Sequence, residues 1–237
     1  MKPQTRKIVD SYSKAMSQLT DTSKQILQWK LDNIDWSDIT AGANEAVRIM
    51  EKHCGLSARQ SASLAAKFYD GLRQQEIGER LGAEPFDGRE PAATENVVRG
   101  FVNRIVDKDD VDGFNRLCGD RLDYEMHNAA RNTIGHNTYR DPHKPKYAVV
   151  PSGDCCTFCA MLASRGPVYS NPSSCENFHA HCTCSAVPTW ERDKATGKYV
   201  MNIDGYDQDY YLDRYKHPEE YRGISRDEYY ENGYREP

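Results

Sequence analysis

The sequence contains few of the residues that build hydrophobic cores. Isoleucine, leucine, valine and phenylalanine together supply 39 of the 237 residues, whereas self-contained globular proteins draw at least roughly a fifth of their residues from these four types. The mean hydropathy is −0.83, but the formal net charge of −5 is too small for charge repulsion to keep the chain disordered. We therefore expect a folded protein that completes its apolar burial with a metal ion or with partner proteins.

Long apolar stretches are also missing. The amino-terminal run MKPQTRKIVDSY lacks the apolar stretch that a signal peptide needs, and nowhere does the chain offer the apolar length of a membrane-spanning helix. We expect neither secretion nor membrane insertion. In a reducing compartment, clustered cysteines bind metals or take part in redox chemistry more often than they form structural disulfides.

Helices are expected over most of residues 1–140. The spacing of apolar residues predicts two helices separated by a break at 20–23 and a third that stops at Gly55. A fourth helix should end near Gly82. These segments together form a body of helix hairpins.

Two further helices are expected after a loop at 83–93, which contains two prolines and a glycine. Thr94 is the expected cap of the first, and the second begins at about Val111. At Gly135 the composition changes, and short β-like runs follow in residues 141–198. We therefore expect an α+β fold, with a helical body over 1–140 and a small α+β module over 141–198.

The last part of the chain, residues 199–237, is rich in tyrosine and acid. It contains nine of the fifteen tyrosines and has ten acidic against five basic residues, so the whole net charge of −5 falls in this segment. Such a composition lacks the aliphatic residues of an independent core, although tyrosine makes large contacts when a partner surface is present. We expect an extended docking tail.

Six of the eight cysteines lie within residues 155–184. Cys156 and Cys159 form a CxxC pair, and His179, Cys182 and Cys184 follow in the pattern HxxCxC. Tetrahedral zinc sites take four sulfur or nitrogen ligands, commonly two from a CxxC turn and two from a second short segment. Iron–sulfur and copper sites favour other ligand sets. The spacing therefore predicts a zinc site.

We expect Cys156, Cys159, His179 and Cys182 to bind this zinc ion. Cys184 is an alternative fourth ligand, because the two sulfurs of an extended CxC segment point to the same side. Unligated thiols or a disulfide among these cysteines are the competing interpretation.

Motifs of known catalytic sites are missing. H-E-x-x-H, G-x-S-x-G and the P-loop are absent, and the deaminase pattern H-x-E…P-C-x-x-C is not met. A structural zinc can by itself fold a module that has a thin core. We therefore expect a structural zinc and no enzymatic activity, and assign no catalytic or cofactor-binding residue. A nucleic-acid-binding zinc module and a protease or nuclease are the alternatives, although a pI of about 5.8 offers no broad basic surface.

The cysteine-rich segment resembles a known family. The run GDCCTFCAMLASRGPVY at 153–169, followed by FHAHCTC at 178–184 and by Pro188, is similar to the carboxy-terminal module of phage Mu F-like minor head proteins. That module combines C-x-x-C, a short helix with a small-residue turn, and H-x-x-C-x-C. Cys155, Cys175 and the tyrosine-rich tail depart from the family pattern.

The resemblance implies a structural part of a phage head. It leads us to expect a minor capsid protein that binds the portal protein and/or the major capsid protein during head assembly in the host cytoplasm. Its place in the virion would be the capsid interior or the portal vertex. Packaged DNA is a further candidate partner, and contact with a membrane is not expected.

Overall fold

The computed structural model describes residues 3–151, 155–175 and 184–221. Its elements are, in chain order, α1 Pro3–Leu31, α2 Ile39–Ile77, α3 Pro91–Phe101, α4 Asn103–Lys108, α5 Val111–Arg140, β1 Lys146–Val150, α6 Thr157–Ser164, the 3-10 helix η1 Pro172–Cys175, β2 Ser185–Thr189 and α7 Gln208–Lys216. The fold is mainly helical with a small sheet, which confirms the α+β class. In this described part of the chain, none of the helices has the apolar length of a membrane span.

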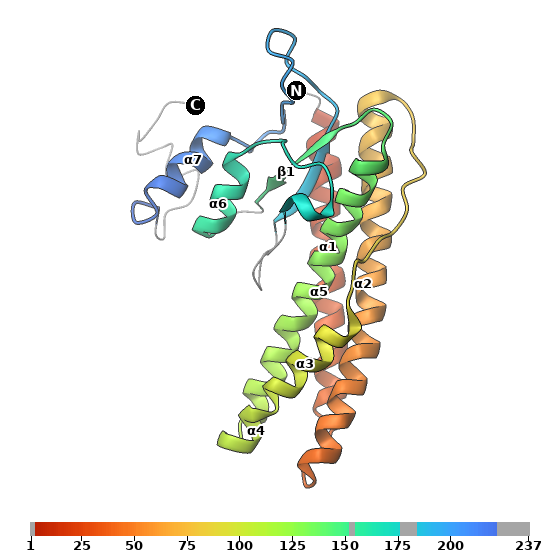
Figure 1. The fold of residues 1–237 in the computed structure, drawn as a ribbon, viewed down its shortest axis with the longest axis vertical. Coiled ribbons are helices and arrows are strands. Elements are labelled where there is room, and N and C mark those ends of the chain that lie inside the picture. Colours follow the sequence, from red (N-terminus) through yellow and green to blue (C-terminus); the bar gives the residue numbers. More distant parts are fainter. Residues whose placement is uncertain (1–2, 152–154, 176–183, 222–237) are drawn as a thin grey trace.

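Three long helices, α1, α2 and α5, form a bundle along the long axis of the molecule (Figure 1). Tyr12 of α1 stacks on Phe68 of α2 with ring centroids 4.1 Å apart. Aspartates cap two of these three long helices: Asp38 precedes α2 and accepts hydrogen bonds from backbone N–H groups of its first turn, and Asp110 does the same for Gly113 in α5. These caps and the apolar packing determine where the long helices begin.

The expected breaks at 20–23 and at Gly55 are wrong, because α1 and α2 run through them without interruption. Thr20 and Ser23 are buried within α1. A Cβ atom on Gly55 would lie 3.0 Å from Nη1 of Arg89. Gly55 therefore makes room for an arginine side chain and does not end a helix.

Two other sequence expectations for this part of the chain are also wrong. The α3 helix begins at Pro91 after Glu90, and Thr94 lies buried inside it, where its hydroxyl donates to Glu125 at 2.9 Å. The α2 helix ends at Ile77 with Gly78 as its C-cap residue, before the expected Gly82. Gly135 lies inside α5, which continues to Arg140, where the expected helical body ends. The backbone of η1 approaches Gly135 so closely that a Cβ atom there would be 2.6 Å from the nitrogen of Pro172.

The two strands pair antiparallel, with Lys146 opposite Thr189 and Val150 opposite Ser185. The sheet contacts α5, β1 also contacts α6, and α6 in turn packs extensively on α7. In Figure 1 these elements lie beside the upper end of the bundle. The sheet therefore packs directly on α5, and α6 and α7 extend from the sheet away from the bundle (Figure 1).

Buried apolar residues form two main clusters. The upper core joins the bundle to β1, β2, α6 and α7; it includes Tyr69, Ile134, Val149, Leu162 and Tyr211. The lower core lies between the other halves of the long helices and α3 and α4; it includes Leu27, Met50, Val98, Phe114 and Leu122. The described residues thus form two main cores, one at each end of the bundle.

The expectation of an extended tail is wrong for the described part of residues 199–237. Residues 208–216 form α7, capped by Asp207, and Tyr210, Tyr211 and Tyr221 are buried at 3%, 4% and 2% exposure. Their rings contact one another in the upper core. These three tyrosines therefore pack against other parts of the same chain. Residues 222–237 lie outside the described residues.

Candidate functional site

The CxxC pair lies at the amino-terminal end of α6. Cys156 is the N-cap residue, with an extended backbone and an exposed side chain. Its sulfur accepts a hydrogen bond from the backbone N–H of Cys159, with an N–S distance of 3.4 Å. Cys159 is one turn further on and only 2% exposed. The two sulfur-bearing residues therefore share the first turn of a helix.

This placement fits half of a zinc site. The positive end of the helix dipole and an N–H donor at the sulfur both favour the thiolate, which is the form of cysteine that binds zinc. The neighbouring backbone is also held in place, because Nε of Arg214 in α7 donates to the carbonyl of Cys155 at 3.0 Å. Residues that would hold zinc here are thus positioned by α6 and α7 together.

The other expected ligands divide into two groups. His179 and Cys182 lie outside the described residues. Cys184 lies directly before β2 and is 5% exposed. Within the described ranges, which omit 176–183, no three His, Cys, Asp or Glu side chains form a group that could hold a metal. Two of the four expected zinc ligands, His179 and Cys182, are thus not tested by the described residues.

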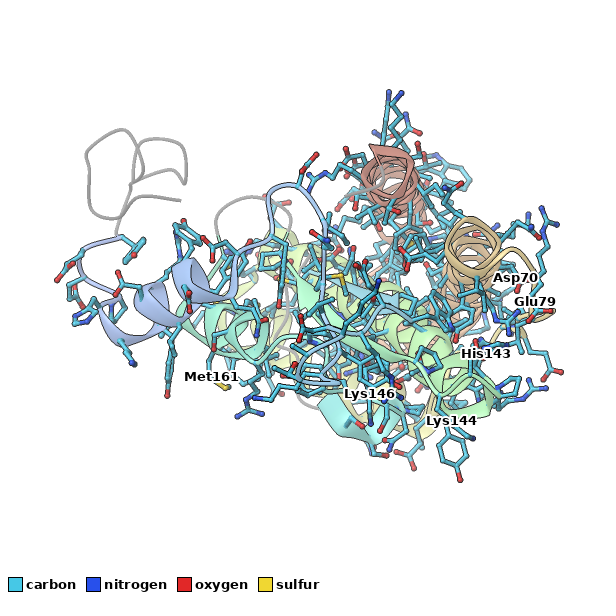
Figure 2. The ribbon with its side chains drawn as sticks, turned by 90° about the horizontal axis from the view of Figure 1, so that it is seen from above. Asp70, Glu79, His143, Lys144, Lys146 and Met161 are labelled. Carbon is cyan, nitrogen blue, oxygen red and sulfur yellow. The ribbon has the colours of Figure 1, made fainter. Side chains whose placement is uncertain are left out.

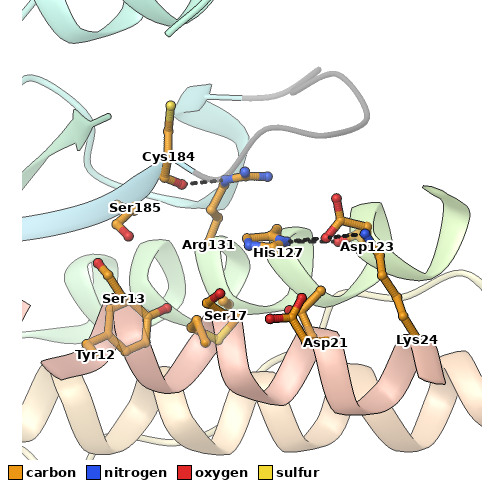
Figure 3. A pocket seen from close by; sticks show the side chains of 14 residues that line it. Tyr12, Ser13, Ser17, Asp21, Lys24, Asp123, His127, Arg131, Cys184 and Ser185 are labelled. Carbon is orange, nitrogen blue, oxygen red and sulfur yellow. Dashed lines mark hydrogen bonds and ion pairs between the residues drawn. The ribbon is translucent and has the colours of Figure 1, made fainter. Parts of the chain in front are cut away.

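A pocket with both polar and apolar lining residues lies next to Cys184, between α1, α5 and the start of β2. Its cavity has a volume of about 480 Å³. Figure 3 shows Ser13 and Ser17 of α1 on one wall and His127 and Arg131 of α5 on the other. The volume is in the range of small-ligand sites.

His127 and Asp123 form the charged centre of this pocket. Nδ1 of His127 lies 3.3 Å from the Asp123 carboxylate and 3.0 Å from the Asp123 carbonyl, and Nζ of Lys24 lies 3.5 Å from the same carboxylate. Burial opposes ionisation of Asp123, but the hydrogen bond with His127 and the charge of Lys24 outweigh it and hold the pKa of Asp123 below its usual value. Two acceptors at Nδ1 assign the proton to that nitrogen, which leaves Nε2 as the basic atom in neutral His127.

Arg131 connects the pocket to the cysteine module. Its side chain is buried, and its Nε donates to the carbonyl of Cys184 at 3.3 Å. Figure 3 shows the sulfur of Cys184 on the side away from His127 and Asp123. The thiol of Cys184 is therefore directed toward the module and its backbone toward the pocket.

The sequence pattern predicted the cysteine pair but not this pocket. Asp123 and His127 are spaced i, i+4 on one helix, a signal that could have paired them. No comparable signal links them to Lys24 on α1, because that contact depends on how the helices pack.

The comparison with known families gives one match. The family model for VG15 protein matches residues 3–217. The chain belongs to the VG15 protein family. This match spans both the bundle and the cysteine module, and the family is a viral one, which supports the phage origin implied by the sequence resemblance. No curated protein and no solved structure matches the chain.

Proposed function

We propose that this VG15 family protein is a Mu F-like minor head protein of a tailed bacteriophage. In this role it binds the portal protein and/or the inner capsid surface during head assembly, and it acts as a structural component with no catalytic function. The match to a viral family over residues 3–217 is the observation that carries the proposal, together with the Mu F-like pattern of the cysteine module. The virion, at the capsid interior or portal vertex, is the proposed location.

Exposed apolar side chains on α1 support a docking role. Ile26 and Trp29 lie on the same helical face at i, i+3 and are 45% and 69% exposed. Tryptophan is enriched at the centres of protein interfaces, where it contributes a large share of the binding energy. This face is therefore the surface proposed to meet the portal or capsid subunits.

Head incorporation tests the proposed role. We expect full-length protein, co-expressed with the portal and major capsid proteins of its phage, to co-sediment with proheads. Replacing Ile26 and Trp29 together by serine should reduce the bound amount by about tenfold or more, since one buried interface tryptophan alone contributes about 2 kcal/mol. Val168→Ser is the matched control, because Val168 is 52% exposed outside the bundle. Absence of the wild-type protein from proheads would overturn the proposal.

The zinc ion belongs to the same proposal, with Cys156, Cys159, His179 and Cys182 as ligands and Cys184 as the alternative fourth. Bound zinc would fold and staple the module. Protein purified without added zinc should contain about one equivalent by elemental analysis, and Cys159→Ser should lose it, whereas Cys54→Ala in the lower core should retain it. Comparison of Cys182→Ser with Cys184→Ser identifies the fourth ligand. Less than half an equivalent in the wild type, with fully titratable thiols, would exclude the site.

A second candidate function, peptide hydrolysis, is favoured by the His127–Asp123 pair beside the pocket hydroxyls. A neutral histidine oriented by a carboxylate is a common general base. If the protein cleaves co-expressed capsid protein, His127→Gln should abolish cleavage and leave the circular dichroism spectrum unchanged. His136→Gln, on the same helix but outside the pocket, is the control. Absence of cleavage by the wild type supports the structural role.

A further inference from the structure

A second cavity, of about 380 Å³, lies at the end of the bundle beside β1, and its lining is basic. Three of the lining residues are Lys144, Lys146 and Arg192. Figure 2, which views the molecule from this end, shows Lys144 and Lys146 near one another. Because the chain as a whole has a net charge of −5, this concentration of positive charge runs against the overall balance.

The three cations are not neutralised by neighbouring carboxylates. Among the described residues, no Asp or Glu forms an ion pair with Lys144, Lys146 or Arg192. The carboxylate of the adjacent Asp193 instead accepts hydrogen bonds from the backbone N–H groups of Ala195 and Thr196. The charge of the cavity is thus available to an anionic ligand.

A buried carboxylate holds both segments that carry these cations. Asp141 is 0% exposed, and its Oδ2 accepts from Arg73 Nε at 2.8 Å, from Tyr69 OH at 3.0 Å and from Trp190 Nε1 at 3.1 Å. Its Oδ1 accepts from the backbone N–H of His143 at 2.9 Å. One side chain therefore fixes the turn before Lys144 and the segment before Arg192.

Contacts between the two segments complete the cavity. The hydroxyl of Tyr199 donates to the carbonyl of Lys144 and accepts from Arg192. The guanidinium carbon of Arg192 lies 4.1 Å from the centroid of the Tyr199 ring. Lys144 has a φ of 48°, a left-handed conformation that lysine rarely adopts. Such conformations persist where the surroundings enforce them and are frequent at binding sites.

An aromatic ring also lies at the cavity. Tyr139 lines it and is 66% exposed. Exposed aromatic rings beside cations are the typical composition of single-strand binding surfaces, where a base stacks on the ring and the cations contact phosphate oxygens. A cavity of this size accommodates one nucleotide that has left a duplex stack.

We propose that this cavity binds single-stranded nucleic acid, with Lys144, Lys146 and Arg192 contacting phosphate oxygens and a base stacking on Tyr139. The site does not depend on the proposed head role, because it rests only on the charge, shape and aromatic lining of the cavity. It also differs from the expected zinc site, because neither Cys156, Cys159 nor Cys184 lines this cavity.

Fluorescence anisotropy of a labelled twelve-nucleotide oligothymidylate with full-length protein tests the site. We expect binding at 50 mM salt that weakens as salt rises. The double variant Lys144→Gln with Lys146→Gln should bind about tenfold or more weakly, and its log–log salt slope should be flatter by about 1.4, since each single-strand phosphate contact contributes about 0.7. Lys52→Gln with Lys67→Gln, two exposed lysines of α2, changes the net charge equally and should keep the wild-type slope.

Two further measurements make the inference falsifiable. Tyr139→Ser should weaken single-strand binding by about fivefold or more, and a duplex of equal length should bind less tightly than the single strand. Equal loss in both double lysine variants would show a diffuse charge effect and overturn the site. No wild-type binding at 50 mM salt, or duplex binding as tight as single-strand binding, would also overturn it. Thermal unfolding by circular dichroism establishes that each variant is folded.

Discussion

The two ends of the bundle bury apolar surface with different kinds of side chain. The lower core consists of aliphatic residues, methionine, phenylalanine and two cysteines, and no tyrosine belongs to its described members. The upper core includes seven buried tyrosines together with small residues of β1, β2 and α6. The shortage of aliphatic residues in the sequence is therefore met at the upper end by aromatic rings that each carry a hydroxyl.

Buried hydroxyls need hydrogen-bond partners, and this makes the upper end more dependent on polar contacts. Tyr169 donates to the carbonyl of Leu162 at 3.1 Å, and Tyr147 donates to the carbonyl of Asn171 at 3.0 Å. At the lower end, by contrast, burial raises the pKa of the Cys54 thiol to about 12, so this side chain stays neutral and packs as a small apolar group. We therefore expect the loss of a buried polar group to lower the free energy of unfolding more at the upper end than at the lower end.

The largest effect is expected for Asp141→Asn. The change leaves Arg73, whose side chain is 3% exposed, without its buried carboxylate partner, which typically costs about 3–5 kcal/mol. Urea unfolding followed by Trp190 fluorescence and by circular dichroism measures the loss. Trp29 and Trp36 also emit, so each is replaced by phenylalanine in the background used for all variants.

The control for this comparison is Asp107→Asn. Asp107 is exposed on α4 at the lower end, and such surface substitutions usually change stability by less than about 0.5 kcal/mol. Equal losses in the two variants would contradict the special role of the buried carboxylate. A selective loss of the Trp190 transition in Asp141→Asn would further show that the upper end can unfold before the lower end.

The sequence predicted the elements better than it predicted their ends. Helical spacing of aliphatic residues predicted the helical regions but divided α1 and α2 into four helices. The α5 helix begins at the expected Val111, after its cap Asp110. The predicted breaks at 20–23 and Gly55 were wrong because these residues are selected by tertiary packing. Thr20 and Ser23 are buried within α1, and Gly55 leaves space for the Arg89 side chain. A local residue preference cannot reveal such a contact between distant segments.

The same limit applies to the sites. Cys156 and Cys159 could be found from the sequence because the pair lies within a single turn. The pocket residues Lys24 and His127 come from helices far apart in the chain, and their approach depends on the bundle. Likewise, Asp141 directly follows α5, and its burial depends on Arg73 and Trp190, which lie far away along the chain in both directions.

A smaller effect is expected from Gly135→Ala at the upper end. The added methyl group would lie 2.6 Å from the backbone nitrogen of Pro172, and forcing backbone segments apart typically costs about 1–3 kcal/mol. Gly119→Ala on the same helix has no neighbour within 4 Å of the new Cβ atom, so it should stabilise the protein by about 0.5–1 kcal/mol. Urea unfolding of both variants should therefore show opposite signs, and stabilisation by Gly135→Ala would refute the close packing of η1 on α5.

The smallest effect is a pH dependence at the lower end. Nε2 of His53 donates to the carbonyl of Ser23 at 2.8 Å, and Nδ1 contacts Nζ of Lys30 at 3.1 Å. Burial, opposed in part by the Ser23 hydrogen bond and assisted by the charge of Lys30, lowers the pKa of His53. The unfolded chain therefore binds a proton more readily than the folded chain just below the unperturbed histidine pKa of about 6.5.

Stability should accordingly fall as the pH decreases from 7 toward 5, with a contribution from this residue of at most about 1.4 kcal/mol per pH unit. His53→Gln should flatten that slope, because glutamine keeps a donor and an acceptor but does not titrate. His136, whose pKa burial also lowers, contributes a residual slope that His136→Gln should remove separately. An unchanged slope in His53→Gln would mean that protonation of His53 does not oppose folding. Loss of stability on changing a buried polar group would then be expected at the upper end only.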